Sequence, residues 1–286
     1  MEMRLYTSRG LVALLALGAF VGFAQSARAD RNDLTLERLL GPPKTPGAFN
    51  DPDLATQTEY RSLMSELGVV MAPTLLSPAD SLGWSGFQFD LASSFTQISN
   101  QSDYWKKGVA DVSSSWLSTV SVLARKGIWA PLPSFEIGAG GTALTDSGIF
   151  ALQAYAKLAL HEGYHGWAMP SMALRAAVSR LVGTTQVDMT VISTDATLSK
   201  SFGLGGTMRL DPYLGANLLV TIVRSQVIDT TPNIDAYKQY PSTVDLNSNT
   251  TFPDAAGDNI LRWRMFAGFR LVYSVVSLSA EFSYAF

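Results

Sequence analysis

The sequence predicts an all-β chain: a transmembrane antiparallel up-and-down β-barrel of about ten strands (range roughly 8–12) that follows a cleaved signal peptide. Three observations lead to this fold class. Apolar residues recur at every second position in one segment after another. The composition is 47% hydrophobic and only 16% charged. After the N-terminal signal, no apolar run reaches the roughly 20 residues that a membrane helix needs.

The N-terminal 29 residues have the pattern of a secretory signal. Arg4 and Arg9 form a charged start, and 10–23 is an uninterrupted apolar run. The small-x-small pattern at 27–29 fits a cleavage site, so we expect the mature chain to begin at Asp30.

The charge balance argues against nucleic acid as a partner. Removing 1–29 takes away three of 21 basic residues and one of 24 acidic residues, so the mature net charge is 18 − 23 = −5. A nucleic-acid-binding domain would be basic. The chain contains no cysteine, so it can form no disulfide.

The segment 30–62 is a polar leader that we expect to be mostly loop, because Gly and Pro recur at 41–43, 46–47 and 52. We expect it to form an arm or a plug-like strap, with a disordered leader as the alternative. The predicted domains are therefore a signal peptide (1–29), a leader that is mostly loop (30–62) and a β-barrel (63–286).

Ten later segments read as strands. Most have the roughly 9–11 residues that a spanning strand needs, and their apolar residues alternate with polar or small ones. An open sheet edge in lipid would leave backbone groups unpaired, so we expect the sheet to close. The predicted strands are 67–76, 84–98, 113–125, 134–143, 149–160, 171–181, 187–201, 208–227, 260–272 and 276–286.

Charged residues lie on the strand faces opposite the apolar stripes. An Arg on the lipid face at the membrane midplane would cost about 2–4 kcal/mol, so these charges should face the lumen. The predicted lumen-facing charged residues are Asp90, Glu136, Lys157, Arg175, Arg262, Arg264, Arg270 and Glu281.

The last predicted strand is the most regular. Its apolar face is formed by Val276, Leu278, Ala280, Phe282, Tyr284 and Phe286. An exported chain whose final strand alternates and stops on an aromatic residue resembles the outer-membrane β-barrel proteins of Gram-negative bacteria, a porin-like class. The stretches SELGVVMAP, SPADSLGWSGFQFDL and SKSFGLGG are also similar to uncharacterised exported barrel proteins, from which no activity carries over.

The resemblance implies that the barrel (63–286) lies in the cell outer membrane and that the leader (30–62) is periplasmic. It also implies that Phe282, Tyr284 and Phe286 form the signal that the barrel-assembly machinery recognises. The partners it implies are outer-membrane lipid, that machinery and periplasmic chaperones.

One feature conflicts with this class, in which both termini are usually periplasmic and long loops extracellular. If Phe286 is periplasmic, the long connection 229–259 falls on the periplasmic side as well. Either one strand is miscounted, or the barrel closes in an atypical way, or a final strand is lacking.

The sequence HEGYH at 161–165 matches the zinc motif H-E-x-x-H and contains both histidines of the chain. On a helix, His161 and His165 would bind Zn²⁺ and Glu162 would activate water. The preceding residues alternate as in a strand, however, and the usual third ligand is missing, with only Asp188 or Asp195 to replace it. We therefore predict a loop here, with no catalytic residue, metal or cofactor. A zinc metallohydrolase, or metalloprotease, is the minor alternative.

The mixed charges of the predicted lumen favour a channel or transporter-like pore for small solutes. The alternative is a structural or adhesion barrel whose lumen is plugged, as in small barrels filled by side chains. Neither function is enzymatic.

Overall fold

The computed structural model describes residues 30–40, 54–75, 77–111, 114–129, 134–162, 169–226, 228–229, 249–250, 252 and 259–286. The predicted signal peptide and most of the connection 229–259 lie outside these residues. Within them, no helix combines the length and the apolar character needed to cross a membrane.

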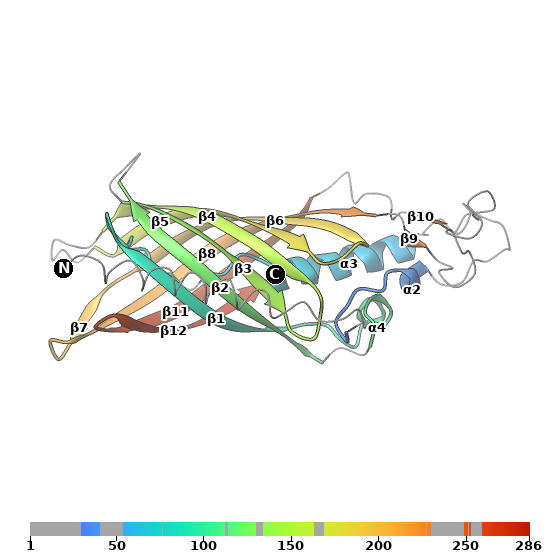
Figure 1. Ribbon diagram of the computed structural model, residues 1–286, viewed down its shortest axis with the longest axis horizontal. Coiled ribbons are helices and arrows are strands. Elements are labelled where there is room, and N and C mark those ends of the chain that lie inside the picture. The colour runs from blue at the N-terminus through green and yellow to red at the C-terminus, as the bar shows by residue number, and fades with distance from the viewer. Residues whose placement is uncertain are drawn as a thin grey trace, which may run out of the picture.

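One antiparallel sheet dominates the molecule, and it curls along the long axis (Figure 1). Each long strand pairs with the next long strand along the chain, and the short strand β7 (Phe202–Leu204) pairs with β8. The all-β, antiparallel part of the prediction is therefore confirmed. The long strands are β1 (Phe87–Gln97), β2 (Trp116–Ile128), β3 (Phe135–Leu144), β4 (Phe150–His161), β5 (Ser171–Val182), β6 (Val187–Ser199), β8 (Met208–Ser225), β11 (Ile260–Tyr273) and β12 (Val276–Ala285).

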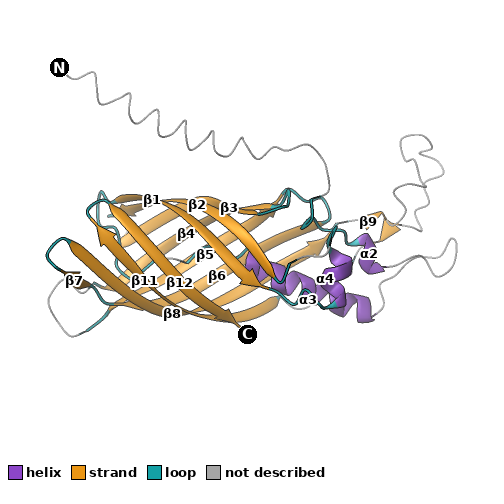
Figure 2. Ribbon diagram, turned by 90° about the horizontal axis from the view of Figure 1, so that it is seen from below, coloured by secondary structure: helices purple, strands orange, loops and turns teal. Residues whose placement is uncertain are grey.

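A helical cap lies at one end of the curled sheet (Figure 1). We use this name for α2 (Glu37–Leu40), α4 (Asp103–Gly108) and the first turns of α3 (Leu54–Val70). The two-stranded pair of β9 (Ile228–Asp229) and β10 (Asn249–Thr250) lies at the same end, while β7 lies at the opposite end. Figure 2 shows α3 entering the curled sheet from the cap.

Nine of the ten predicted strands are present, because their alternation matches the two faces of the sheet. In β4, for example, Ala151, Gln153 and Tyr155 are buried on the inner face, whereas Leu152 and Leu160 are exposed on the outer face. We call the space on the inner side of the curled sheet the lumen.

The remaining predicted strand, 67–76, is wrong. Residues up to Val70 belong to α3, and the chain then continues inside the sheet without joining it. The reason lies in a longer pattern: Leu63, Met64, Leu67 and Met71 are spaced as one face of a helix. The predicted boundary between leader and barrel, at 62/63, falls inside α3.

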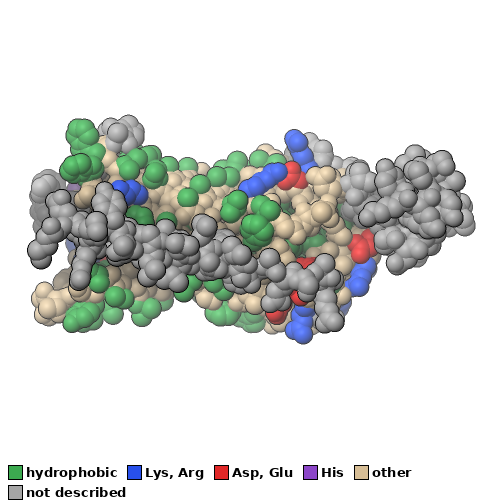
Figure 3. All heavy atoms as spheres, in the orientation of Figure 1, with side chains coloured by type: hydrophobic (Ala, Val, Ile, Leu, Met, Phe, Trp, Pro, Cys, Tyr) green, Lys and Arg blue, Asp and Glu red, His purple; other side chains and the backbone are tan. Residues whose placement is uncertain are grey.

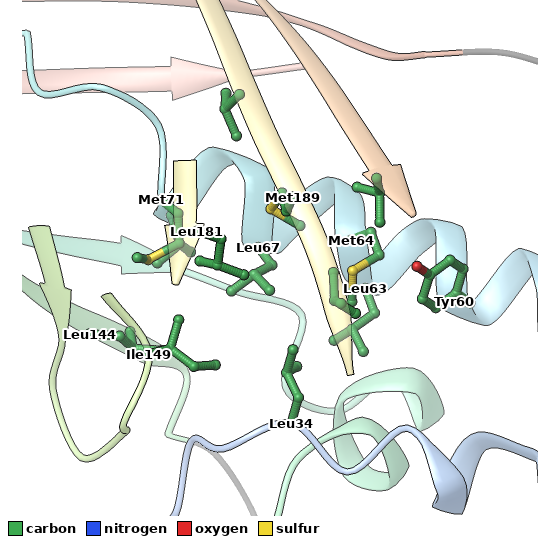
Figure 4. Close-up of a cluster of buried hydrophobic side chains, with 14 of the residues drawn as sticks. Leu34, Tyr60, Leu63, Met64, Leu67, Met71, Leu144, Ile149, Leu181 and Met189 are labelled. Atoms are coloured by element: carbon green, nitrogen blue, oxygen red, sulfur yellow. The ribbon is translucent and has the colours of Figure 1, made fainter. Parts of the chain in front are cut away.

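The apolar half of the lumen is packed around α3. Leu63, Leu67 and Met71 have almost no exposed surface and meet Leu181 and Met189 of the sheet in one cluster (Figure 4). On another side of the helix, a Cβ atom on Gly68 would lie only 2.4 Å from Thr221 Oγ1. The helix therefore sits against β8 at a distance that only glycine permits.

This contact yields a test of the helix position. Gly68→Leu should lower the free energy of unfolding by about 1–3 kcal/mol, because the new side chain has no space beside Thr221. Gly203→Leu is the control, since nothing lies within 4 Å of the corresponding Cβ on β7. Urea unfolding followed by tryptophan fluorescence gives the two midpoints; equal midpoints would show that α3 does not lie against β8.

Candidate functional site

The predicted lumen-facing charges lie on the inner face of the sheet, and they differ in burial. Asp90, Arg262 and Glu281 are half-buried. The other five are buried: Glu136, Lys157, Arg175, Arg264 and Arg270. Three groups of contacts bring most of these charges together with acidic, basic and tyrosine partners from neighbouring strands.

The first group is built around Glu136 of β3, which has no exposed surface. Tyr155 donates a hydrogen bond to its Oε1 at 2.6 Å, and Lys157 Nζ lies 3.3 Å from the same atom. Arg125 Nη1 lies 4.0 Å away, and its Nε pairs with Asp90 at 2.8 Å. Both basic residues therefore share one buried carboxylate.

Gly138 makes room for this arrangement. A Cβ atom on Gly138 would lie 2.1 Å from the Tyr155 ring, so the ring needs glycine on the neighbouring strand. The guanidinium of Arg175 lies over the Tyr155 ring, 5.3 Å from the ring centre. This cation–π contact links the first group to the second.

The second group joins β5, β6 and β8. Arg175 Nε pairs with Asp195 Oδ2 at 2.9 Å, and Asn217 Nδ2 donates to Ser193 Oγ at 2.8 Å. Arg264 lies buried on the inner face of β11 and forms no ion pair with any described carboxylate.

The third group lies toward the end that carries β7. Arg270 donates from Nε and Nη2 to Oδ2 of Asp211, at 3.0 and 2.8 Å. Arg209 Nε approaches Asp211 Oδ1 at 3.0 Å. Tyr213 donates to Glu281 Oε2 at 3.1 Å, which fixes the predicted lumenal glutamate of β12.

Three buried charged residues of this network were not among the predicted site residues: Arg125, Asp195 and Asp211. All three lie on the inner faces of segments that were predicted as strands. The same alternation that placed Glu136 and Arg175 would have placed them in the lumen too.

The chain itself supplies the partners of these charges. We call residues 71–75 and 77–82 the strap; they follow α3 through the lumen toward the start of β1. Lys157 Nζ donates to Ser77 Oγ at 3.0 Å and to Asp80 O at 2.9 Å. Arg175 Nη1 donates to Thr74 O at 2.7 Å. Arg125 Nη1 also donates to Ser77 Oγ at 3.0 Å, so three cations of the sheet hold the strap directly.

Wall acceptors hold the strap as well. Leu82 N donates to Glu136 Oε2 at 3.0 Å, and Thr74 N donates to Gln153 Oε1 at 2.9 Å. A cavity of about 10 Å³ lies between strap and wall, lined by Thr74, Ser77 and Arg175 among others. That volume is at the lower limit for a single water molecule.

The zinc-like motif begins at the end of β4, where Glu162 meets the strap. His161 is the last residue of β4, in a strand and not in a helix. Glu162 Oε1 accepts hydrogen bonds from Ser81 N at 2.9 Å and from Ser81 Oγ at 2.5 Å. His165 lies outside the described residues. Within the described part of the chain, no group of three His, Cys, Asp or Glu residues is arranged to hold a metal.

The aromatic residues of the predicted assembly signal lie on the outer side of the final strand. Phe282, Tyr284 and Phe286 are all exposed. Phe286 exchanges two backbone hydrogen bonds with Trp263, at 2.9 and 3.2 Å, so pairing with β11 continues to the end of the chain.

The two ends of the sheet order, β1 and β12, come close to each other. Gln88 Nε2 donates to Ser277 Oγ at 3.2 Å, although no backbone pairing joins the two strands. The sheet has nine long strands, and each runs opposite to its neighbour. The first strand, β1, and the ninth, β12, therefore run in the same direction. We call the line between these two strands the seam.

Glu66 of α3 connects helix α4 of the helical cap with the residues that follow β1. Its Oε2 accepts from Trp105 Nε1 at 2.6 Å and from Ser99 N at 3.0 Å, and its Oε1 accepts from Tyr104 at 2.8 Å. Burial acts to raise the pKa of Glu66, but the hydrogen bonds from Ser99, Trp105 and Tyr104 together lower it. The carboxyl group is therefore ionised at neutral pH.

The buried ionic group around Glu136 can be tested by removing its centre. Glu136→Ala should lower the free energy of unfolding by about 3–5 kcal/mol, because Lys157 and Arg125 would stay buried without their shared carboxylate. The matched control is Asp188→Ala, which removes a partly exposed ion pair with Arg180 and should cost at most about 1 kcal/mol. Equal urea midpoints for the two variants would contradict this account of the lumen.

A comparison of the chain with family models, with curated proteins and with solved structures finds no match.

Proposed function

We propose that this chain is an outer-membrane β-barrel of a Gram-negative bacterium whose lumen is sealed by its own N-terminal segment. It would serve as a membrane-embedded scaffold for the helical cap and would not conduct small solutes in this state. The observation that carries this proposal is the strap, which occupies the lumen with its polar groups bonded to the wall. Of the two functions that the sequence favours, this is the plugged barrel.

The outer surface supports a lipid environment. Leu91 is 79% exposed and Phe282 is 75% exposed, both on outer faces of long strands. In Figure 3, hydrophobic side chains gather over the strands, whereas acidic side chains are seen toward the helical cap. Such a large exposed apolar surface is unusual for a monomer in water and is typical of a membrane or protein interface.

The lumen gives two reasons for a permanent seal. The apolar half holds α3 through the cluster of Leu63, Leu67 and Met71, which water would have to enter if the helix left. The polar half would leave Glu136 and Lys157 facing an open pore, without the strap atoms that now complete their hydrogen bonds. Moving the segment out would therefore expose apolar surface and remove bonds at the same time.

The strap also explains how the chain can enter and leave at the same end although it has nine long strands, an odd number. The chain enters from the cap, crosses the lumen as α3 and strap, and begins β1 at the far end. Nine strands then return the chain to the cap end at Phe286. The resemblance to outer-membrane barrels would place this end, with the cap and the connection after β8, in the periplasm.

This orientation favours a scaffold over an adhesin. The opposite end carries short connections, such as the two residues between β11 and β12. A protein that binds surfaces outside the cell through a long loop would need that loop at the end opposite the cap. The larger connection leaves from the cap end, so a binding partner of the cap would be periplasmic.

The sealed barrel is tested by gel mobility and by conductance. The purified chain should migrate differently with and without boiling, as folded barrels do, and it should add no ion conductance to a planar lipid bilayer. A helical circular dichroism spectrum without heat modifiability would contradict the barrel. Stable single-channel conductance would contradict the seal and favour the small-solute channel.

Closure of the barrel gives a second test. Open edges in lipid would cost several kcal/mol for each unpaired backbone group, so β1 and β12 should pair. A short bis-maleimide should cross-link the double variant Gln88→Cys/Ser277→Cys in folded protein, since the native side chains hydrogen-bond across the seam and the chain has no other cysteine. Gln88→Cys/Ser283→Cys is the control, with the second thiol about 20 Å further along β12. Equal cross-linking of both pairs, or of neither, would contradict the seam.

A further inference from the structure

A cavity opens at the seam, at the end next to the helical cap. Its volume is about 160 Å³, more than ten times the space that one water molecule needs. Its walls come from the last residues of β1, from Ala285 of β12, from α3 and from Arg262 of β11. The cavity therefore lies where the inside of the barrel meets its outer surface.

Two opposite charges line this cavity without pairing with each other. Arg262 donates from Nε to Ser65 Oγ at 2.7 Å, and no described carboxylate lies within ion-pair distance of it. Glu66 is held by Ser99, Tyr104 and Trp105, and no described cation pairs with it. The cavity thus offers one fixed cation and one fixed anion with no net charge between them.

Apolar surface continues from the cavity along the seam. Phe95 of β1 and Tyr284 of β12 are exposed on the outer face, within two residues of cavity-lining positions on their strands. Phe282 adds a third exposed ring on the same face of β12. A ligand with a charged head in the cavity could lay hydrocarbon chains against these rings.

We propose that the seam cavity binds the headgroup of a phospholipid that carries a phosphate and a primary ammonium group, as phosphatidylethanolamine does. The phosphate would lie at Arg262 and the ammonium group at Glu66, with the acyl chains over Phe95 and Phe282. This inference rests on the proposed membrane function and adds a ligand to it.

Charge and hydrogen bonding select this headgroup over two others. Phosphatidylglycerol carries a net negative charge and would leave Glu66 beside an anion without a cation. Phosphatidylcholine carries a quaternary ammonium group, which has no N–H to donate to the Glu66 carboxylate. A primary ammonium group supplies both the charge and the donors.

Native mass spectrometry of the full chain in detergent tests the site, with each of the three lipids added in turn. Phosphatidylethanolamine should bind roughly tenfold more tightly than phosphatidylcholine or phosphatidylglycerol. Arg262→Gln should lose about that factor, whereas Arg262→Lys should keep most of it because the charge remains. Arg180→Gln is the matched control: an exposed arginine on the outer face of β5, near the same end, whose loss should change nothing.

The glutamate gives an independent readout that a purely structural role would not move. Glu66→Gln should shift the preference from phosphatidylethanolamine toward phosphatidylglycerol, because only the cation remains. Soluble glycerophosphoethanolamine should compete poorly, since it lacks the chains. If it displaces the lipid at equal concentration, the cavity takes a soluble zwitterion and the lipid assignment is overturned.

Heat modifiability is measured on every variant, so folding and binding are separated. A heat-modifiable wild-type protein that does not distinguish the three lipids overturns this inference and leaves the barrel proposal in place. A wild-type protein that is not heat-modifiable overturns both. If Arg262→Gln fails to fold, Arg262→Lys and the changed preference of Glu66→Gln decide the outcome.

Discussion

The carboxylate of Glu136 has no exposed surface, and much of the lumen is arranged around the need to compensate it. An ionised group in this position requires both opposite charge and hydrogen-bond donors. Lys157 and Arg125 supply the charge, while Tyr155 and the Leu82 backbone supply donors. Because one of these donors belongs to the strap, the wall charges and the path of the N-terminal segment depend on each other.

This dependence explains why the lumen has two unlike halves. Near the cap, α3 meets an apolar wall and satisfies its own backbone within the helix. Beyond Val70 the strap has no such internal pairing, and its N–H and C=O groups must find partners on the wall. Gln153, Lys157 and Arg175 supply them. The polar half of the wall therefore lies where the segment inside is no longer helical.

Much of the sheet was predictable because alternation reports which face each residue takes. That rule found nine strands and put Glu136 and Arg175 on the same face. It failed at 67–76, where an apolar run has no clear period and Pro73 interrupts it. The helical spacing that settles the matter begins earlier, at Leu63, directly at the predicted boundary between the polar leader and the barrel.

The contacts between wall and strap were beyond such a rule. Alternation says that Lys157 faces inward, but it does not say what it meets there. That depends on which part of the chain returns through the lumen. A plug-like strap was one of the expectations for the leader 30–62, whereas the strap of the structure, 71–75 and 77–82, comes after it in the sequence. The ion pairs across neighbouring strands, such as Arg175 with Asp195, were easier to predict, because they follow from the register of two adjacent predicted strands.

The strap lies inside the curled sheet, and thiol labelling of Ala79→Cys in the folded chain tests this placement most directly. Ala79 has no exposed surface, and its Cβ can be extended to a thiol without removing a polar contact of its side chain. A water-soluble maleimide should leave this thiol unlabelled until the protein is unfolded, while it labels Val275→Cys, in the exposed turn between β11 and β12, at once. Equal labelling rates for the two thiols in folded protein would contradict the sealed lumen.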